Sequence, residues 1–428
     1  MIDSVVNAFK IPDLRRKLLF TFAMLAIFRF LAHVPVPGVN TEALKRLFES
    51  NQLIGMLDLF SGGAMSSFSI AAMGVYPYIT ASIIMQLLIP MVPALQELSK
   101  EGEAGRNKIN QYIHWVTVPL AALQALGTGS LLASNQLGVI QRFNLFAYPL
   151  STLSIILSMT AGTMLAVWIG ELITENGIGN GISIVIFGGI VARLPSAIAQ
   201  SLAGGINIVG LVAFGVLGVL TVAAIVVVQE GQRRVPVQFA KRIRGTRMYG
   251  GTTTHIPIRV NSAGMIPLIF AMSIMLFPGT VASYFQYASG WLGSVASFVA
   301  VVFSPTHLVY WLLYFLMVVG FTFFYTIVIF QQQNIPESLQ KNGGFIPGIR
   351  PGRPTGEYLN KVLMRVTWFG ALFLGVVAVL PYFVQNLTNV TALSLSSTAL
   401  LIVVGVVLDT MKQLESQLLM RNYQGFMK

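Results

Sequence analysis

The sequence predicts an all-α, polytopic membrane protein. Of its 428 residues, 55% are hydrophobic and only 10% are charged, a balance that soluble domains do not have. The hydrophobic residues gather in runs of about 20 residues, the length that a helix needs to cross a bilayer. Short polar segments separate these runs. The chain is therefore expected to cross the membrane many times.

We expect ten spans, each resting on one apolar run. The N-terminal run has no small-residue cleavage site after it, so it is expected to remain as the first span instead of being removed as a signal peptide. The first span contains Arg29, and the last is diluted by serine and threonine. The predicted spans are Leu18–Val34, Tyr76–Leu95, Ile113–Ala133, Ala147–Gly170, Ile178–Ala199, Ile206–Val228, Asn261–Phe285, Leu308–Phe330, Val362–Val384 and Leu395–Asp409.

The lysines and arginines predict the orientation. With an even number of spans, both termini lie on one side, and 22 of the 27 basic residues fall on that side. Because cytoplasmic loops are enriched in these residues, both termini are expected in the cytoplasm. Ten spans divide into five in residues 1–200 and five in residues 201–428. An odd number per half means that an internal repeat, if present, is inverted.

One apolar segment, Ser61–Gly74, is too short and too rich in serine and glycine to cross a bilayer. Such a segment is tolerated at membrane depth only where protein or a water-filled cavity surrounds it. It is either a loop on the outer face or a short re-entrant helix that acts as a movable, weakly packed plug. The plug residues would be Ser61, Gly62, Gly63, Ala64, Met65, Ser66, Ser67, Phe68, Ser69, Ile70, Ala71, Ala72, Met73 and Gly74.

Six isoleucines stand out by position. Two of them share one face of the second span and two share one face of the fifth, because each pair is four residues apart. Composition alone favours ordinary core or lipid-facing side chains. The alternative is a ring of branched apolar side chains that closes a pore by excluding water. The six are Ile79, Ile83, Ile186, Ile190, Ile269 and Ile402.

Few polar residues lie inside the predicted spans. A buried amide in hydrocarbon is costly unless it is paired. Gln86 and Asn261 either meet across a seam between helices, or Asn261 caps its own helix and Gln86 bonds within the bundle. Span centres lack acidic residues, which argues against an ion-coupled pump.

Two predicted cytoplasmic loops are unusual. Residues 231–259 carry seven basic residues and no acidic one, and residues 331–361 are rich in glycine and proline around Arg350 and Arg353. Neither loop is apolar enough for a domain, so each is expected to form a short hairpin. Anionic lipid attracts such charge, but its density also suits RNA or an acidic protein face.

Nucleotide and metal sites are not expected. The glycine-rich segment 177–183 does not follow a strand, and 102–108 lacks the spacing of a phosphate-binding loop. The glycines of 177–183 instead predict a flexible, closely packed beginning of the fifth span. The chain has no cysteine, and its four histidines are far apart in sequence. We expect neither a cofactor nor enzymatic chemistry.

Several stretches together resemble the SecY family, the central subunit of the protein-conducting channel. They are LFSGGAMSSFSIAAMGVYPYITASIIMQLL, KEGEAGRNKINQY, TENGIGNGISIVIFGGIVARLP, VNSAGMIPLIFAMSIMLFP and NGGFIPGIRPGRPT. The likeness extends from Pro12 to Tyr423. It implies a passive channel in the bacterial plasma membrane that moves unfolded polypeptides across and releases membrane segments sideways into lipid.

The resemblance also implies roles for particular residues. Ser61–Gly74 would be the plug, the six isoleucines the pore ring, and the loop between the fifth and sixth spans the hinge. The second and seventh spans would form a lateral gate with Thr80, Gln86, Asn261 and Ser273. The ribosome, including its RNA, or the SecA motor ATPase would dock on Lys241, Arg242, Arg244, Arg247, Arg350 and Arg353. SecE and SecG would complete a heterotrimer, and signal peptides, nascent chains and anionic lipids would be further partners.

Two other functions fit a polytopic protein. A secondary transporter would need a solute site near the midplane of the bilayer. A lipid-handling scaffold or enzyme would need a catalytic polar group inside a span. We find neither pattern in the residues.

Overall fold

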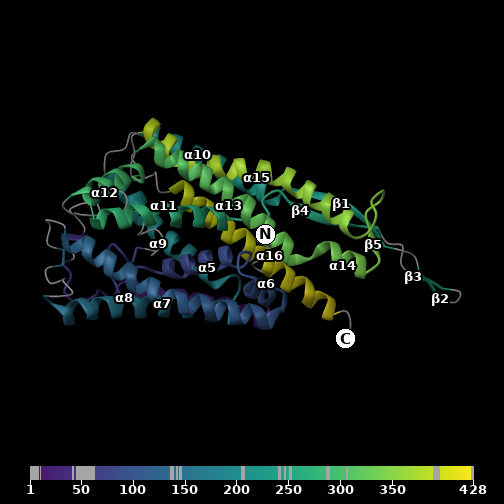
Figure 1. The fold of residues 1–428 in the computed structure, drawn as a ribbon, viewed down its shortest axis with the longest axis horizontal. Coiled ribbons are helices and arrows are strands. Elements are labelled where there is room, and N and C mark those ends of the chain that lie inside the picture. Colours follow the sequence, from purple (N-terminus) through teal and green to yellow (C-terminus); the bar gives the residue numbers. More distant parts are fainter. Residues whose placement is uncertain are drawn as a thin grey trace.

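The computed structural model is a bundle of long helices with a small sheet at one end (Figure 1). It describes residues 9, 11–40, 43–44, 63–134, 139–140, 143, 147–203, 208–239, 242–244, 247–249, 253–285, 290–304, 307–388 and 396–425. The helices of the first half are α2 (Pro12–Leu31), α5 (Tyr76–Leu88), α6 (Pro93–Lys100), α7 (Glu103–Ser134), α8 (Pro149–Asn176) and α9 (Gly181–Ala203). Those of the second half are α10 (Ile208–Glu230), α11 (Ile266–Phe285), α12 (Trp291–Val302), α13 (Leu308–Gln333), α14 (Ile335–Lys341), α15 (Arg353–Thr388) and α16 (Ser396–Gly425).

Each predicted span overlaps one of these helices, because long apolar runs satisfy their backbone groups best as helices. By length and composition, three helical stretches of the described chain can cross a membrane alone: Pro149–Asn176, Leu308–Lys341 and Arg353–Leu380. A fourth candidate is the pair α5 and α6, which is bent by 101°. The chain is thus a helical membrane protein.

Two predicted boundaries are wrong, and one helix was not predicted. The second predicted span reached Leu95, but α5 ends at Leu88 and the chain turns sharply into α6. Pro90 and Pro93 explain the break, since proline lacks the N–H that would continue the helix. The seventh predicted span began at Asn261, yet residues 261–265 form turns and α11 begins at Ile266. Helix α12 was not expected at all.

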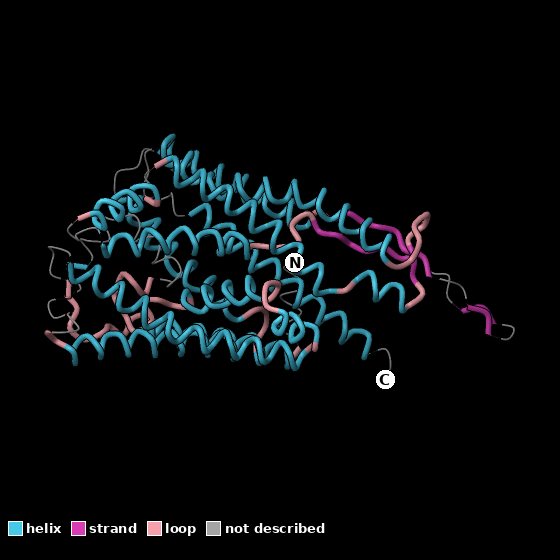
Figure 2. Tube along the Cα trace, in the orientation of Figure 1, coloured by secondary structure: helices cyan, strands magenta, loops and turns pink. Residues whose placement is uncertain are grey.

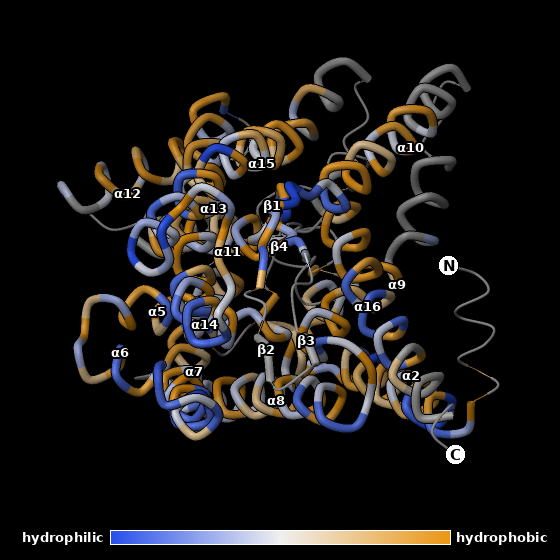
Figure 3. The backbone as a smooth tube through the Cα atoms, turned by 90° about the vertical axis from the view of Figure 1, so that its right-hand side faces the viewer, coloured by the Kyte–Doolittle hydropathy of each residue, from blue (hydrophilic) through white to orange (hydrophobic). Residues whose placement is uncertain are grey.

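The helices pack as two groups that meet in the middle. In the first half, α5 packs on α7, α7 on α8 and α8 on α9. In the second half, α11 packs on α12 and α13, and α13 on α15. Contacts of α11 with α5 and α7, and of α16 with α9, join the groups. Viewed from the sheet end, the helices surround the middle of the molecule (Figure 3).

The basic segment 231–259 forms the predicted hairpin. Strand β1 (Gln232–Phe239) pairs antiparallel with β4 (Thr253–Arg259), and the short strands β2 (Arg242–Arg244) and β3 (Arg247–Tyr249) pair farther out. The long strands β1 and β4 run beside the end of α15, and the short pair β2–β3 projects beyond the helices at that end of the molecule (Figure 2). Successive β1 side chains alternate between buried and exposed near Val235 and Val237, as expected for a strand with one covered face.

The segment 331–361 is not a hairpin. It holds the end of α13, then α14, strand β5 (Gly344–Phe345) and the beginning of α15. Strand β5 pairs with the second edge of β1, so both basic loops belong to one three-stranded sheet in the order β4–β1–β5. Apolar side chains of the sheet and α15 form a small separate core, and these are Val235, Val237, Ile258, Ile346, Leu359 and Leu363.

Candidate functional site

The six isoleucines lie together at the centre of the molecule. Each is buried, with no more than 7% of its surface exposed, and all belong to one apolar cluster. We call the isoleucines, together with all the buried apolar residues of the same contiguous cluster, the central apolar cluster. The lipid-facing interpretation is therefore wrong. The core interpretation holds, and a ring of side chains drawn from both halves of the chain fits the same positions.

The two isoleucines of α9 are held in place by the glycine-rich turn before that helix. The N–H of Gly181 donates to Thr174 Oγ1 (2.9 Å), and the N–H of Ser183 donates to Asn180 Oδ1 (3.1 Å) at the helix beginning. A Cβ added at Gly181 would overlap the carbonyl oxygen of Gly170. The predicted close packing is confirmed, and glycine is required because α8 and α9 touch through their backbones.

The segment predicted as a plug helix is instead a series of turns. Residues 63–75, which we call the turn segment, have positive φ angles at Gly63 (88°), Phe68 (40°) and Gly74 (53°). Left-handed residues interrupt the hydrogen-bond ladder of a helix, so the predicted short helix is wrong here. A β-bridge between Pro35 and Ser69 fastens the segment instead. Ser61 and Gly62 lie outside the described residues.

The turn segment is also more firmly packed than its composition suggested. Phe68 is fully buried, and Ser67 donates its hydroxyl to the carbonyl of Ala32 (3.0 Å). Helix α8 approaches so closely at Gly162 that a Cβ there would overlap the backbone of Ile70. The missing side chain of Gly162 makes this contact with the Ile70 backbone possible. The expectation of a weakly packed segment is therefore wrong.

The turn segment contacts two apolar clusters. Its residues Ala64 and Ala71 belong to the central apolar cluster, together with the six isoleucines. Other side chains of the segment pack against α7 and α8 in a second cluster, and these are Met65, Phe68, Ala72 and Met73. The interpretation as a loop lying on the outer face is excluded by this burial.

Helices α5 and α11 meet along the boundary between the halves, and we call this boundary the seam. Gln86 and Asn261 do not meet across it. The amide nitrogen of Gln86 donates to Ser82 Oγ (3.2 Å) within α5, and that of Asn261 donates to the carbonyl of Gly264 (2.9 Å). The alternative of local bonding is thus correct for Gln86, while Asn261 closes a turn before α11 instead of lying in the helix.

A tyrosine that the sequence reasoning missed links the two sides of the seam. The hydroxyl of Tyr76, in the first turn of α5, donates to the backbone carbonyl of Ser273 in α11 (3.0 Å). Thr80 bonds back to the Tyr76 carbonyl (3.1 Å) and so stays within α5. Nothing in the sequence marked Tyr76, because its partner is a main-chain atom 197 residues away.

Several buried oxygen atoms on α5, on α11 and in the turn before α11 have no hydrogen-bond partner within the described structure. They are Gln86 Oε1, Asn261 Oδ1 and Ser273 Oγ. A buried polar atom left unpaired costs about 1–3 kcal/mol. The closed arrangement is therefore not optimised for its own stability at the seam.

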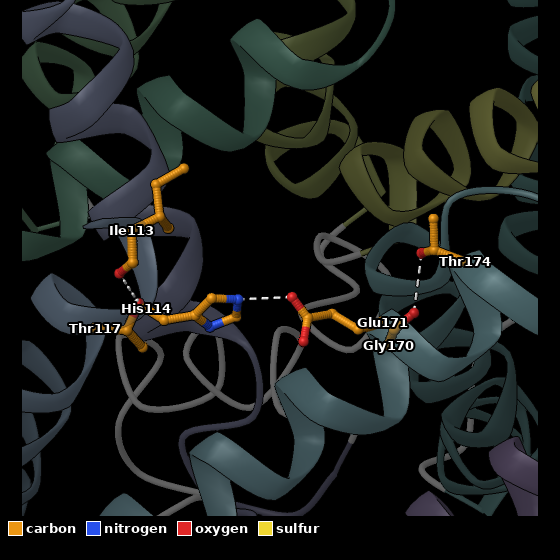
Figure 4. A network of polar contacts seen from close by, with 6 residues as sticks. All are labelled: Ile113, His114, Thr117, Gly170, Glu171 and Thr174. Atoms are coloured by element: carbon orange, nitrogen blue, oxygen red, sulfur yellow. Dashed lines mark hydrogen bonds and ion pairs between the residues drawn. The ribbon is translucent and has the colours of Figure 1, made fainter. Parts of the chain in front are cut away.

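A second missed pair joins α7 to α8. His114 Nε2 lies 2.6 Å from Glu171 Oε1, and Figure 4 shows the two side chains pointing toward each other. The ring of Tyr78 from α5 lies beside His114, with centroids 5.6 Å apart. Glu171 follows the predicted end of the fourth span by one residue, which is why a search of span centres overlooked it. The pair ties the helices behind α5 together.

The predicted docking residues surround the sheet. Arg350 and Arg353 are exposed, and left-handed glycines at 348 and 352 shape the turn that carries them. Thr355 Oγ1 donates to the Arg350 carbonyl (2.8 Å), which fixes this turn on the first turn of α15. Arg242, Arg244 and Arg247 lie on β2 and β3, whereas Lys241 lies outside the described residues.

Long apolar helices in two groups, a buried branched centre between them and a charged sheet at one end define a membrane protein of the channel or transporter class. A model of the family named SecY matches residues 69–411, which is most of the chain. The chain therefore belongs to the SecY family.

Curated relatives agree along the whole length. The chain is similar to the protein translocase subunit SecY of Thermotoga maritima, with 44% identity over 437 residues that cover 100% of this chain and 98% of the relative. It is also similar to the subunit of the same name from Streptomyces scabiei, with 42% identity over 444 residues and 100% of both chains covered.

Solved structures share the fold. A structure described as a protein-conducting channel gives a TM-score of 0.61 with 16% identity, over 94% of this chain and 92% of that one. A SecY structure whose plug domain is reported to stabilise the closed state gives 0.64, and Sec61 in a canine ribosome-channel complex gives 0.61. Both show the same identity and coverage.

The unpaired hydroxyl at the seam makes a testable prediction. Ser273→Ala removes a buried unsatisfied Oγ but keeps the carbonyl that accepts from Tyr76, so stability should be unchanged or rise by about 1 kcal/mol. Ser67→Ala removes a hydroxyl that is bonded to Ala32 and should lower stability. Thermal unfolding of the purified protein in detergent compares the two variants. A clear loss for Ser273→Ala would mean that its hydroxyl has a partner.

Proposed function

We propose that this protein is the central, passive subunit of a protein-conducting channel in the bacterial plasma membrane, with ten spans, two inverted halves and both termini in the cytoplasm. It moves unfolded polypeptides across the membrane and releases apolar segments sideways into lipid. The names of its curated relatives support translocase activity. The observation that carries the proposal is the burial of six isoleucines from α5, α9, α11 and α16 in one cluster beside the turn segment.

The chemistry of the centre suits a seal. Branched apolar side chains offer no atoms that bind water or ions, so a narrow ring of them keeps the resting channel dry. The turn segment fills the space beside the ring and acts as the plug. Because apolar contacts are not directional, the same side chains close around many different translocating sequences.

The seam suits a lateral gate. A signal peptide is apolar enough to partition between α5 and α11, where it replaces their mutual contacts with its own. The unpaired oxygens of Gln86, Asn261 and Ser273 lower the cost of this exchange, because the closed seam leaves them unsatisfied. Thr80 belongs to the same gate helix. The halves, residues 1–200 and 201–428, separate about the connection between α9 and α10, and residues 204–207 of this connection lie outside the described chain.

The sheet suits docking of the partners that supply energy. The ribosome, through its RNA, or the SecA motor binds the arginines at and around the sheet, since phosphate and acidic surfaces attract a dense basic projection. A neighbouring fold belongs to a Sec61 complex with the ribosome, which supports this partner class. SecE and SecG complete a heterotrimer, and anionic lipids contact the basic loops.

A secondary transporter is less well supported. It would need a charged or broken-helix solute site near the midplane, whereas the centre of the described structure is occupied by apolar side chains. The pair His114–Glu171 joins α7 to α8 and is not part of this cluster, so it does not provide a charged site within it.

The ring is tested by making it polar. Ile83→Asn combined with Ile402→Asn should let water enter the centre and raise ion leakage of liposomes that contain the protein roughly tenfold or more. Ile84→Asn is the matched control, because the neighbouring Ile84 is 36% exposed and points away from the cluster. Equal leakage from the control and the double variant would contradict the ring, and so would leakage unchanged from the wild type.

Docking is tested by charge reversal. Arg350→Glu should strongly impair motor-driven export in a reconstituted translocation assay while insertion and folding remain normal, because the exposed turn makes few contacts within the chain. Lys361→Glu introduces the same charge change on the exposed face of α15 and should have a much smaller effect. Normal export by Arg350→Glu would rule out this turn as a docking site.

A further inference from the structure

Tyr76 stands at the junction of the turn segment and the seam. It is the first residue of α5 and follows Gly74, the last residue of the proposed plug, by two positions. Its side chain is 7% exposed and belongs to the central apolar cluster. Its hydroxyl donates to the Ser273 carbonyl of α11 across the seam (3.0 Å). One residue thus contacts both of the parts that have to move when the channel opens.

The connection between Tyr76 and the turn segment is stiff. The N–H of Tyr76 donates to the carbonyl of Met73 (3.2 Å), and the N–H of Gly74 donates to that of Ala71 (2.8 Å). Val75 is fully buried, and Pro77 restricts the backbone of the residue before it. A displacement of the turn segment is therefore transmitted to Tyr76 instead of being absorbed by a flexible linker.

The acceptor is a main-chain carbonyl inside helix α11. A carbonyl oxygen has two lone pairs, so the Ser273 carbonyl can accept from Tyr76 in addition to a donor of its own helix. The Ser273 side chain is itself only 2% exposed. A carbonyl at this place can accept a bond from outside the helix while remaining shielded from lipid and water.

Aromatic rings behind the bond keep water away from it. Tyr310 on α13 lies close enough to interact electrostatically with Tyr76, and it stacks on Tyr314 with centroids 6.2 Å apart. Both of these tyrosines are at most 2% exposed. In such surroundings a hydrogen bond is strong, and leaving its two partners unpaired is costly.

We propose that the Tyr76–Ser273 hydrogen bond couples displacement of the plug to opening of the seam, an inference that rests on the proposed channel function. Moving the turn segment withdraws the Tyr76 hydroxyl from α11, and separating α11 from α5 breaks the same bond. Each movement therefore makes the other easier, which is the definition of a coupling free energy between two sites. Tyr76 is a positioning residue, and it determines how readily an incoming signal peptide releases the plug.

The absence of cysteine from the chain makes a clean test possible. A single cysteine in the turn segment, Ser66→Cys, reports plug displacement through its rate of reaction with a soluble maleimide in lipid nanodiscs. Tyr76→Phe is added to remove the hydroxyl and keep the ring. Tyr78→Phe is the matched control, because Tyr78 lies on the same helix but its hydroxyl has no hydrogen bond to α11 among the described contacts.

With Tyr76→Phe, basal labelling should rise about two- to tenfold, the range expected for loss of one buried neutral hydrogen bond. A synthetic signal peptide should accelerate labelling in the parent protein, and this acceleration should shrink by the same factor in Tyr76→Phe. Tyr78→Phe should match the parent in both measurements. Unfolding temperatures that are the same in the parent and in Tyr76→Phe would exclude a general loss of structure. A general loss of structure would also be recognised because it raises labelling without selectively removing the response to the peptide.

Basal labelling and peptide response that are both unchanged in Tyr76→Phe would overturn the coupling. So would faster labelling with an undiminished peptide response, because the hydroxyl would then hold the plug without linking it to the seam. A separate measurement on the parent protein distinguishes failure of the coupling from failure of the proposed channel function. If the channel function is wrong, the parent protein shows no signal-dependent transport of a secretory substrate in liposomes.

Discussion

The structure depends on the apolar contact between the two halves of the chain. Four helices contribute branched side chains to one centre. Because lipid tails are as apolar as these side chains, close van der Waals packing holds the helices together here. The side chains of the six isoleucines carry no polar atoms. The contact therefore closes the centre without offering a binding site to water or ions. Because such contacts are not directional, the halves can also separate and meet again without losing a specific geometry.

The neighbouring features follow from that contact. The turn segment is held beside the centre by small residues that allow close backbone approach, as at Gly162. The seam beside it keeps unpaired oxygens on α5 and around α11, and a single tyrosine links the seam to the turn segment. The pair His114–Glu171 holds α7 and α8 together behind α5. The unpaired oxygens at this boundary favour movement at the seam.

The sequence was sufficient for the broad architecture. Hydropathy located the helices because long apolar runs leave the backbone no other way to satisfy its polar groups. The four-residue spacing of Ile79 and Ile83, and of Ile186 and Ile190, correctly placed each pair on one face. Composition alone could not choose between core and lipid, since both surroundings are apolar. The likeness to a known family supplied that choice.

The errors concern features that only tertiary structure decides. The turns of residues 63–75 depend on left-handed angles at Gly63, Phe68 and Gly74, and on pairing with Pro35. Strand β5 pairs with β1, although the paired residues Gln238 and Phe345 are 107 positions apart in the sequence. No local pattern in the sequence predicts this pairing. The most direct test of the central claim is to cross-link a stalled nascent chain to cysteines placed at Ile83, Ile269 and the outward-facing Ile84. The account predicts cross-links at Ile83 and Ile269 but not at Ile84; cross-links at Ile84 alone would contradict it.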